Sequence, residues 1–145
     1  MTEDEIIAAV REIAERQPEP QTYPPLSARD IPAVEAQIGF ALPALLVRVY
    51  TEICDGGFGP GFGMEDLRDA ARIYVRYRDD PYAGDWKWPT GMLPLLHHGC
   101  GIYDCVHCTR PETPMMQFEP NAVSQAESFI PRANSLGEWL AGGCC

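Results

Sequence analysis

Residues 42–63 read LPALLVRVYTEICDGGFGPGFG, and they join the strongest helical pattern of the chain to a loop of alternating glycines. In the first half, apolar side chains recur every three or four residues, which places them on one face of a helix. Pro43 suits the first turn of that helix. The glycines from Gly56 to Gly63 cannot hold a helix. The sequence therefore predicts a central helix that ends in a sharp loop or an extended segment.

Helical patterns also precede and follow this stretch. Residues 3–16 combine the spacing of a capping box with an apolar stripe, so an amphipathic helix is expected there. A short second helix should start near Asp30 and stop at Gly39. A further helical stripe covers residues 67–75. Between the first two helices, the prolines of residues 17–26 predict a surface connection.

From Trp88 onward the period of the apolar residues changes. Short apolar or alternating runs at residues 92–96, 102–107 and 115–118 predict three antiparallel strands, and residues 136–140 predict a short C-terminal helix. Helices followed by strands indicate an α+β fold, with a largely antiparallel sheet packed by the N-terminal helices and the C-terminal helix.

The length of the chain suits one domain that spans all 145 residues and 16.1 kDa. Within it, we interpret residues 1–26 as the N-terminal helix with its proline-rich connection, and residues 141–145 as a flexible tail that ends in two cysteines. Hydrophobic residues at 46% and charged residues at 22% are ordinary globular values and argue against disorder.

Charge narrows the possible partners. The net charge is −10, and residues 1–85 hold 16 acidic and 8 basic side chains. Such a surface disfavours direct nucleic-acid binding and favours a basic protein, although acidity also serves solubility. No apolar run is long enough to span a membrane, and the chain opens on acidic residues instead of a signal sequence, so we expect a cytoplasmic protein.

Cysteines form the clearest candidate metal site. Cys100, Cys105 and Cys108 have the spacing of part of an iron–sulfur motif, and with His107 they could also bind zinc. The same residues lie in and around a predicted strand, where buried thiols would serve packing alone. We expect no metal and no cofactor, and keep a metal or redox protein on these four residues as an alternative.

Signatures of catalysis are weak. The alternating glycines match neither a dinucleotide fingerprint nor a phosphate loop, and no nucleophile elbow or zinc-protease motif occurs. We therefore predict a protein that is not an enzyme.

Several segments, taken in chain order, resemble the SUKH superfamily of cell-wall-assembly regulators and bacterial toxin-immunity proteins. They are the lead into the central helix with Tyr50, the glycine loop that follows Asp55, Trp88-Pro89, the turn at residues 99–103, residues 118–121, and residues 135–140. The fold-defining positions of the resemblance are Gly39, Leu42, Pro43, Gly56, Gly57, Gly59, Gly61, Trp88, Pro89, Gly99, Gly101 and Trp139.

This resemblance implies a protein-binding module without catalysis, and with the net charge it favours an immunity-type protein that neutralises a basic toxin domain such as a nuclease. A regulatory scaffold of cell-wall assembly or signalling is the alternative. The expected contact surface interleaves acids with aromatic rings, and it comprises Asp79, Asp80, Tyr82, Asp85 and Trp86. We assign Trp88 and Trp139 to the core.

Overall fold

The computed structural model describes residues 1–16, 22–60, 62–80 and 87–142. Its helical elements are α1 (Glu3–Glu15), η1 (Ala28–Asp30), α2 (Ile31–Ile38), α3 (Ala44–Arg48), η2 (Val49–Ile53), α4 (Leu67–Asp79), α5 (Gln125–Ser128) and α6 (Leu136–Ala141). Its strands are β1 (Met92–Gly99), β2 (Ile102–His107), β3 (Met115–Phe118) and β4 (Phe129–Ala133). The strands form one antiparallel sheet in the order β1-β2-β3-β4, which confirms the predicted α+β class.

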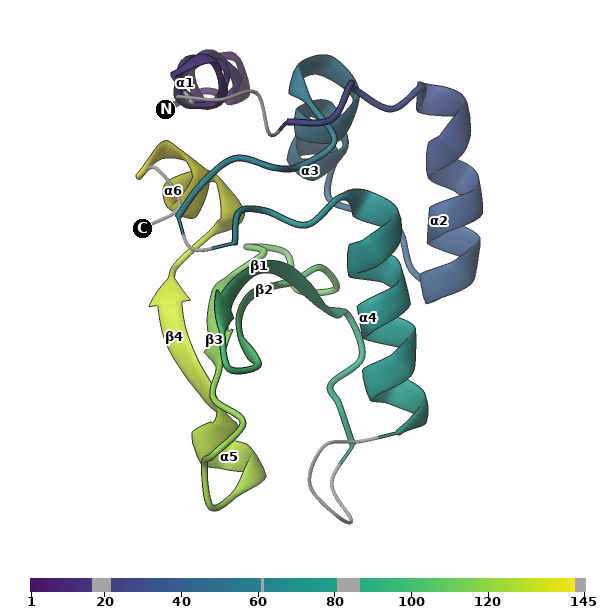
Figure 1. The fold of residues 1–145 in the computed structure, drawn as a ribbon, viewed down its shortest axis with the longest axis vertical. Helices are drawn as coiled ribbons and strands as arrows, with labels where there is room; N and C mark the ends of the chain where they lie inside the picture. Colours follow the sequence, from purple (N-terminus) through teal and green to yellow (C-terminus); the bar gives the residue numbers. More distant parts are fainter. Residues whose placement is uncertain (17–21, 61, 81–86, 143–145) are drawn as a thin grey trace.

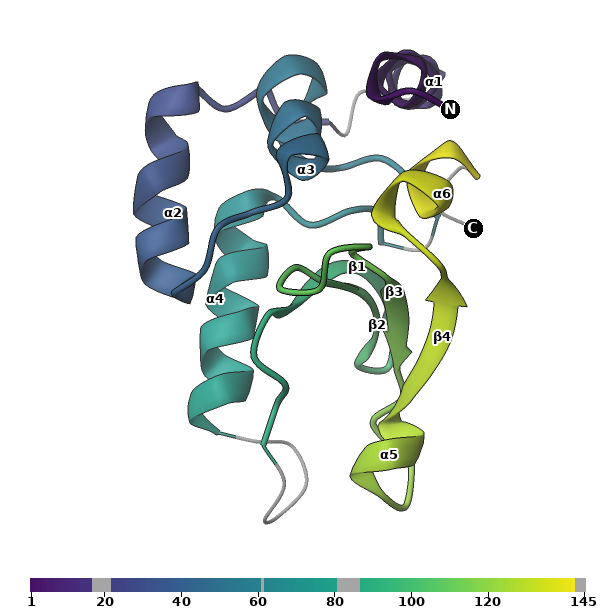
Figure 2. The same ribbon diagram turned by 180° about the vertical axis from the view of Figure 1, so that it is seen from behind.

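The helices pack on the sheet in two groups. In Figure 1, α4 runs alongside the curved sheet with α2 beyond it, while α1, α3 and α6 gather at one end of the sheet. The view from behind, in Figure 2, shows the same grouping. Helix α1 contacts α6 and η2, so the N-terminal helix closes over the C-terminal one.

Helix boundaries follow the predicted caps. The Thr2 hydroxyl accepts from the backbone N–H of Glu5 (3.2 Å), and the Glu5 carboxylate accepts from the N–H of Thr2 (2.8 Å), which completes a capping box. Helix α2 stops at Gly39, whose φ of 86° lies in the left-handed region that glycine tolerates. These local signals place the helix ends without help from the rest of the fold.

The central helix differs in part from the prediction. It is α-helical only from Ala44 to Arg48 and continues as the π-helical η2, with the N–H of Cys54 bonded to the Val49 carbonyl (3.2 Å). The Thr51 hydroxyl donates to the Val47 carbonyl (2.7 Å), and a bond of this kind competes with α-helical pairing.

The sheet has a fourth strand that the sequence pattern did not predict. Strand β4 contains Pro131, and its middle residues are exposed, so it shows neither a strong alternation nor a continuous apolar run. Proline fits there because β4 is an edge strand, where one side of the backbone needs no partner. Pro94 lies in β1, the opposite edge. The short helix α5 was also not predicted.

Aromatic rings fill the space between α4 and the sheet. Trp88 is fully buried, stacks on Tyr77 of α4 (4.6 Å between ring centroids) and meets Phe118 and Phe129 edge-on. Its indole N–H donates to the Met92 carbonyl (2.7 Å), so the ring is buried without an unpaired donor. Trp139 is also buried, which confirms both tryptophans as core residues.

A fully buried carboxylate links the sheet to α6. Asp104 of β2 accepts from the indole N–H of Trp139 (3.0 Å), from Nε of Arg132 (3.2 Å) and from the Gln117 amide (3.4 Å). Nε2 of His98 lies 3.0 Å from the same carboxylate, without the alignment of a hydrogen bond. One side chain thereby ties strands β1, β3 and β4 and helix α6 together.

Replacing Asp104 with alanine should lower the free energy of unfolding by about 3 kcal/mol, because its partners lose their buried acceptor. Asp104→Asn, which retains an acceptor for Trp139, should lose less. Urea denaturation of both variants measures the difference. A loss below about 1 kcal/mol for the alanine variant would show that the buried carboxylate does not hold the sheet to α6.

Candidate functional site

The predicted contact surface lies only partly within the described residues. Asp79 ends α4 and Asp80 follows it, and both side chains are exposed. Tyr82, Asp85 and Trp86 lie outside the described residues. The acid-and-aromatic surface at this end of α4 therefore stays a prediction.

The cysteines of the candidate metal site do not meet at one point, because Cys100 and Cys108 lie beyond opposite ends of β2. Cys100 is exposed at the β1–β2 turn, Cys105 is buried in β2, and Cys108 follows the far end of that strand. A strand of six residues is about 20 Å long, too far for one ion to join its two ends. Burial raises the pKa of Cys105 and raises that of Cys108 to about 12, so both thiols stay protonated at neutral pH.

In the described part of the chain, no three His, Cys, Asp or Glu side chains are grouped to hold a metal ion. His107 contacts the Thr109 hydroxyl through Nδ1 (3.3 Å). The turn that carries Cys100 has a structural explanation, since Gly99, Cys100 and Gly101 all have positive φ.

The surface is instead hollowed where the glycine loop meets the N-terminus of α4, in a pocket of about 470 Å³ that we call the acidic pocket. Its lining residues are Thr22, Tyr23, Gly57, Phe62, Met64, Glu65, Asp66 and Asp69. Three of them are acidic, and two are aromatic residues with exposed fractions of 57% (Tyr23) and 74% (Phe62). Gly57 is one of the predicted fold-defining positions, and none of the other lining residues was predicted as a site.

Asp55 and Gly56 hold the walls of the acidic pocket together. The N–H of Asp55 donates to the Tyr23 carbonyl (3.0 Å), and its carboxylate accepts from the N–H of Leu67 at the start of α4 (2.9 Å). Gly56 has a φ of 81°, and a Cβ there would lie 2.6 Å from the Glu65 carbonyl oxygen. The loop can pass this close to the α4 connection only because Gly56 has no side chain.

Burial and mutual repulsion shape the electrostatics of the pocket. Burial raises the pKa of Asp55, Glu65 and Asp66, and in each case the charge of Asp69 raises it further. Hydrogen bonds from backbone N–H groups at the start of α4 oppose the rise for Asp55 and Asp66. The folded protein thus keeps these carboxylates at an electrostatic cost.

Nearby arginines compensate only part of this charge. Arg72 pairs with Asp69 (2.5 Å) and Arg68 pairs with Asp30 (3.4 Å), both at exposed positions. Within the described ranges, Glu65 forms no ion pair of 4 Å or less. The pocket therefore presents carboxylate charge that a partner could neutralise.

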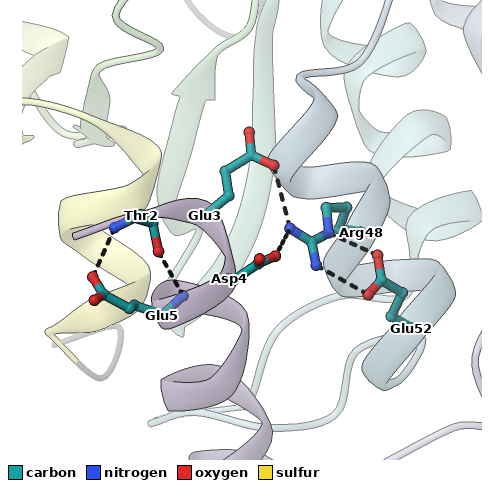
Figure 3. Close-up of polar contacts among 6 residues, drawn as sticks. All are labelled: Thr2, Glu3, Asp4, Glu5, Arg48 and Glu52. Carbon is teal, nitrogen blue, oxygen red and sulfur yellow. Dashed lines mark hydrogen bonds and ion pairs between the residues drawn. The ribbon is translucent and has the colours of Figure 1, made fainter.

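A second group of acids, Glu3, Asp4 and Glu52, surrounds the guanidinium of Arg48 (Figure 3). The Arg48 guanidinium donates to Glu52 through Nε (2.8 Å), and through Nη1 to Asp4 (2.9 Å) and Glu3 (3.5 Å) of α1. The hydrogen bond between Arg48 and Glu52 lowers the pKa of the Glu52 carboxyl and raises the pKa of the Arg48 guanidinium. This cluster fastens α1 to the central helix, and each of its acids contacts the one guanidinium.

An aromatic stack supports the exposed ring of Phe62. Phe62 lies on the imidazole of His97 (5.2 Å between centroids, 22° between planes), and His97 lies on Tyr103 (4.6 Å, 19°). Nε2 of His97 accepts from the N–H of Gly101 (3.2 Å), and burial lowers the pKa of His97, so the ring is neutral at pH 7. The stack holds Phe62 at the rim although water surrounds most of it.

The alternation of Phe58, Pro60 and Phe62 with glycines was a visible signal for an unusual loop. Phe58 is buried and Phe62 is exposed, a difference that the pattern alone does not reveal. In the sequence, the predicted helix at residues 67–75 begins among the acids Glu65, Asp66 and Asp69. Only the fold brings Tyr23 beside them.

The α+β fold thus carries a recessed acidic surface with two exposed aromatic residues in its lining. The chain belongs to the SMI1 / KNR4 family (SUKH-1), whose model matches residues 25–142. Membership supports a protein-binding or immunity-type role at the level of the family. Helix α1 precedes the matched region. No curated protein matches the chain.

The described helices include none that is both long enough and apolar enough to cross a membrane.

Changing Gly56 to alanine tests the close approach in the loop. The variant should lose about 2 to 5 kcal/mol of unfolding free energy, through the positive φ together with the overlap with backbone. Gly39→Ala is the matched control, because Gly39 also has a positive φ but no atom lies within 4 Å of its Cβ position. It should lose only about 1 to 2 kcal/mol. Equal losses in urea denaturation would contradict this account of the loop.

Neutralising Glu65 should stabilise the protein at pH 7. The folded-state pKa of Glu65 lies above its ordinary value of 4.5, so the folded protein holds a proton that the unfolded chain releases. The contribution of Glu65 to the free energy of unfolding therefore falls as the pH rises from 4.5 through the folded-state pKa. Glu65→Gln should raise the melting temperature at pH 7 by a few degrees, and the gain should shrink as pH falls toward 4.5.

Glu52→Gln is the control of opposite sign. The pKa of Glu52 is lowered by Arg48, so its contribution is present at neutral pH and is lost as pH falls through the folded-state pKa. This variant should melt earlier than the wild type at pH 7 and converge with it in acid. If both variants shifted the melting temperature in the same direction, the two acidic clusters would not differ as described.

Proposed function

We propose that this chain is a non-catalytic, immunity-type protein that binds and neutralises a basic toxin domain, with a nuclease as the best-fitting class, and that the acidic pocket is its contact site. The observation that carries the proposal is a pocket that brings three carboxylates beside two exposed aromatic rings, while only Asp69 of the three has an ion pair among the described residues. Family membership and the net charge of −10 point in the same direction.

The physical logic is substrate mimicry by charge. A nuclease site is basic because it holds phosphates, and carboxylates placed there compete with the substrate without any chemistry. Exposed aromatic rings supply the desolvated anchors that carry most of the binding energy at interfaces. In the Arg48 cluster, by contrast, every acid contacts the guanidinium, and neither of the two exposed aromatic residues, Tyr23 and Phe62, belongs to it.

Of the surface predicted from the sequence, the two described residues, Asp79 and Asp80, lie at the other end of α4. The helix has 13 residues and is about 20 Å long, so Asp79 and Asp80 are distant from Glu65 and Asp69. We retain Asp79, Asp80, Tyr82, Asp85 and Trp86 as a proposed secondary contact. This separation makes the two surfaces independently testable.

Charge-reversal variants compare the acidic pocket with the Asp79 and Asp80 surface at the same change in net charge. With the purified partner, Glu65→Lys/Asp69→Lys should slow association about tenfold or more at low salt and weaken its salt dependence. Asp79→Lys/Asp80→Lys, which changes the net charge equally, should slow it less. Stopped-flow association measures both rates, and circular dichroism confirms that both variants fold. A wild-type association rate and salt dependence for Glu65→Lys/Asp69→Lys would remove the acidic pocket from the interface.

The partner itself is identified by capture from a lysate of the source organism, at low and moderate salt, followed by mass spectrometry. A basic toxin-like nuclease whose activity is inhibited at a 1:1 ratio supports the proposal. Capture of envelope-assembly or signalling proteins, without inhibition of a toxin, would favour a regulatory scaffold instead.

A further inference from the structure

The rim of the acidic pocket contains an aromatic ring with one supported face. Phe62 has 74% of its surface exposed, yet it is stacked on His97, which is stacked on the buried ring of Tyr103. The N–H of Phe62 also donates to the His97 carbonyl (3.3 Å). A large apolar side chain fixed in water, with its position set by the rings behind it, is typical of a preorganised anchor for a partner.

The ring that supports Phe62 carries no charge. Nε2 of His97 accepts a hydrogen bond from the N–H of Gly101, so this nitrogen carries no proton. His97 therefore does not place a cation against the inner face of the Phe62 ring. In the described part of the chain, a cation–π contact occurs elsewhere, between Arg76 and Tyr77 (5.7 Å). The outer face of Phe62 thus lies beside carboxylates without a cation of its own.

Arginine fits this combination better than lysine. A guanidinium is planar and weakly hydrated, so it can stack on a ring while its N–H groups pair with a carboxylate, whereas an ammonium is a compact and strongly hydrated charge. The pocket volume of about 470 Å³ lies in the range of sites that enclose drug-sized ligands, about 300 to 1,000 Å³. It has room for one arginine side chain and part of the backbone that carries it.

We propose that the acidic pocket receives an arginine side chain from a loop of the partner protein, with the guanidinium stacked on Phe62 or Tyr23 and paired with Glu65. Carboxylates alone would attract any cation, and the rings make the pocket selective. The inference rests on the proposed function and adds to it the chemistry that the partner must present.

A titration with blocked amino acids tests this on the full chain. Nuclear magnetic resonance follows the backbone amides while acetyl-arginine amide, acetyl-lysine amide or acetyl-citrulline amide is added. Arginine should shift Gly57, Phe62 and Glu65 and bind about two- to fivefold more tightly than lysine. Citrulline has a similar shape without the charge and should bind much more weakly than either. Equal affinities for arginine and lysine, or shifts centred away from the pocket, would overturn the inference.

Variants separate stacking from charge. Phe62→Leu keeps an apolar side chain at an exposed position and should remove the preference for arginine over lysine. Glu65→Gln should weaken both ligands and keep the preference. Val123→Ala, at another exposed apolar residue, is the control and should change neither affinity. An arginine preference that survives in Phe62→Leu would overturn the stacking geometry.

The outcomes also separate this inference from the proposed function. If the pocket shows no preference for arginine but its charge reversal still slows the toxin partner, the inference fails and the proposed function stands. If arginine binds as expected but charge reversal leaves association with the partner unchanged, the proposed contact site fails. Concentration-dependent dimerisation that Phe62→Leu abolishes would identify a second copy as the occupant and overturn the choice of partner.

Discussion

The structure around the candidate site depends on the buried carboxylate of Asp55. The backbone N–H of Asp55 donates to the Tyr23 carbonyl, and its carboxylate accepts from the N–H of Leu67 at the start of α4. The neighbouring Gly56 lets the loop approach the backbone at Glu65. Burial raises the pKa of this carboxyl, and the N–H of Leu67 opposes the rise. One residue therefore joins three segments that are far apart in sequence, and the acidic pocket lies where they meet.

The two acidic clusters have different roles, because the one around Arg48 stabilises the fold and the acidic pocket is the proposed contact site. Around Arg48 the carboxylates share a guanidinium that lowers the pKa of Glu52 and holds α1 in place, whereas burial and then the charge of Asp69 raise the pKa of Glu65 and Asp66 in the pocket. Natural proteins commonly keep such unfavourable charge where function requires it. A partner that brings a cation would relieve the repulsion and gain binding energy from the relief.

Local sequence signals predicted much of the fold, whereas features that depend on contacts between distant segments were not predicted. The capping box at Thr2 and the stop at Gly39 depend on neighbours in sequence, so the pattern located them. Strand β4 was missed because Pro131 and its exposed neighbours hide an edge strand that only pairing with β3 reveals. The acidic pocket was missed for the same reason, since Tyr23 and Glu65 meet only through the contacts of Asp55 and Gly56.

The most direct test of this account is hydrogen–deuterium exchange of the chain, alone and bound to its captured partner. The account predicts that protection on binding is centred on residues 22–23 and 57–66 and the first turn of α4. Protection centred on the end of α4 near Asp79, or on α1 and its Arg48 contacts, with the pocket unchanged, would contradict it.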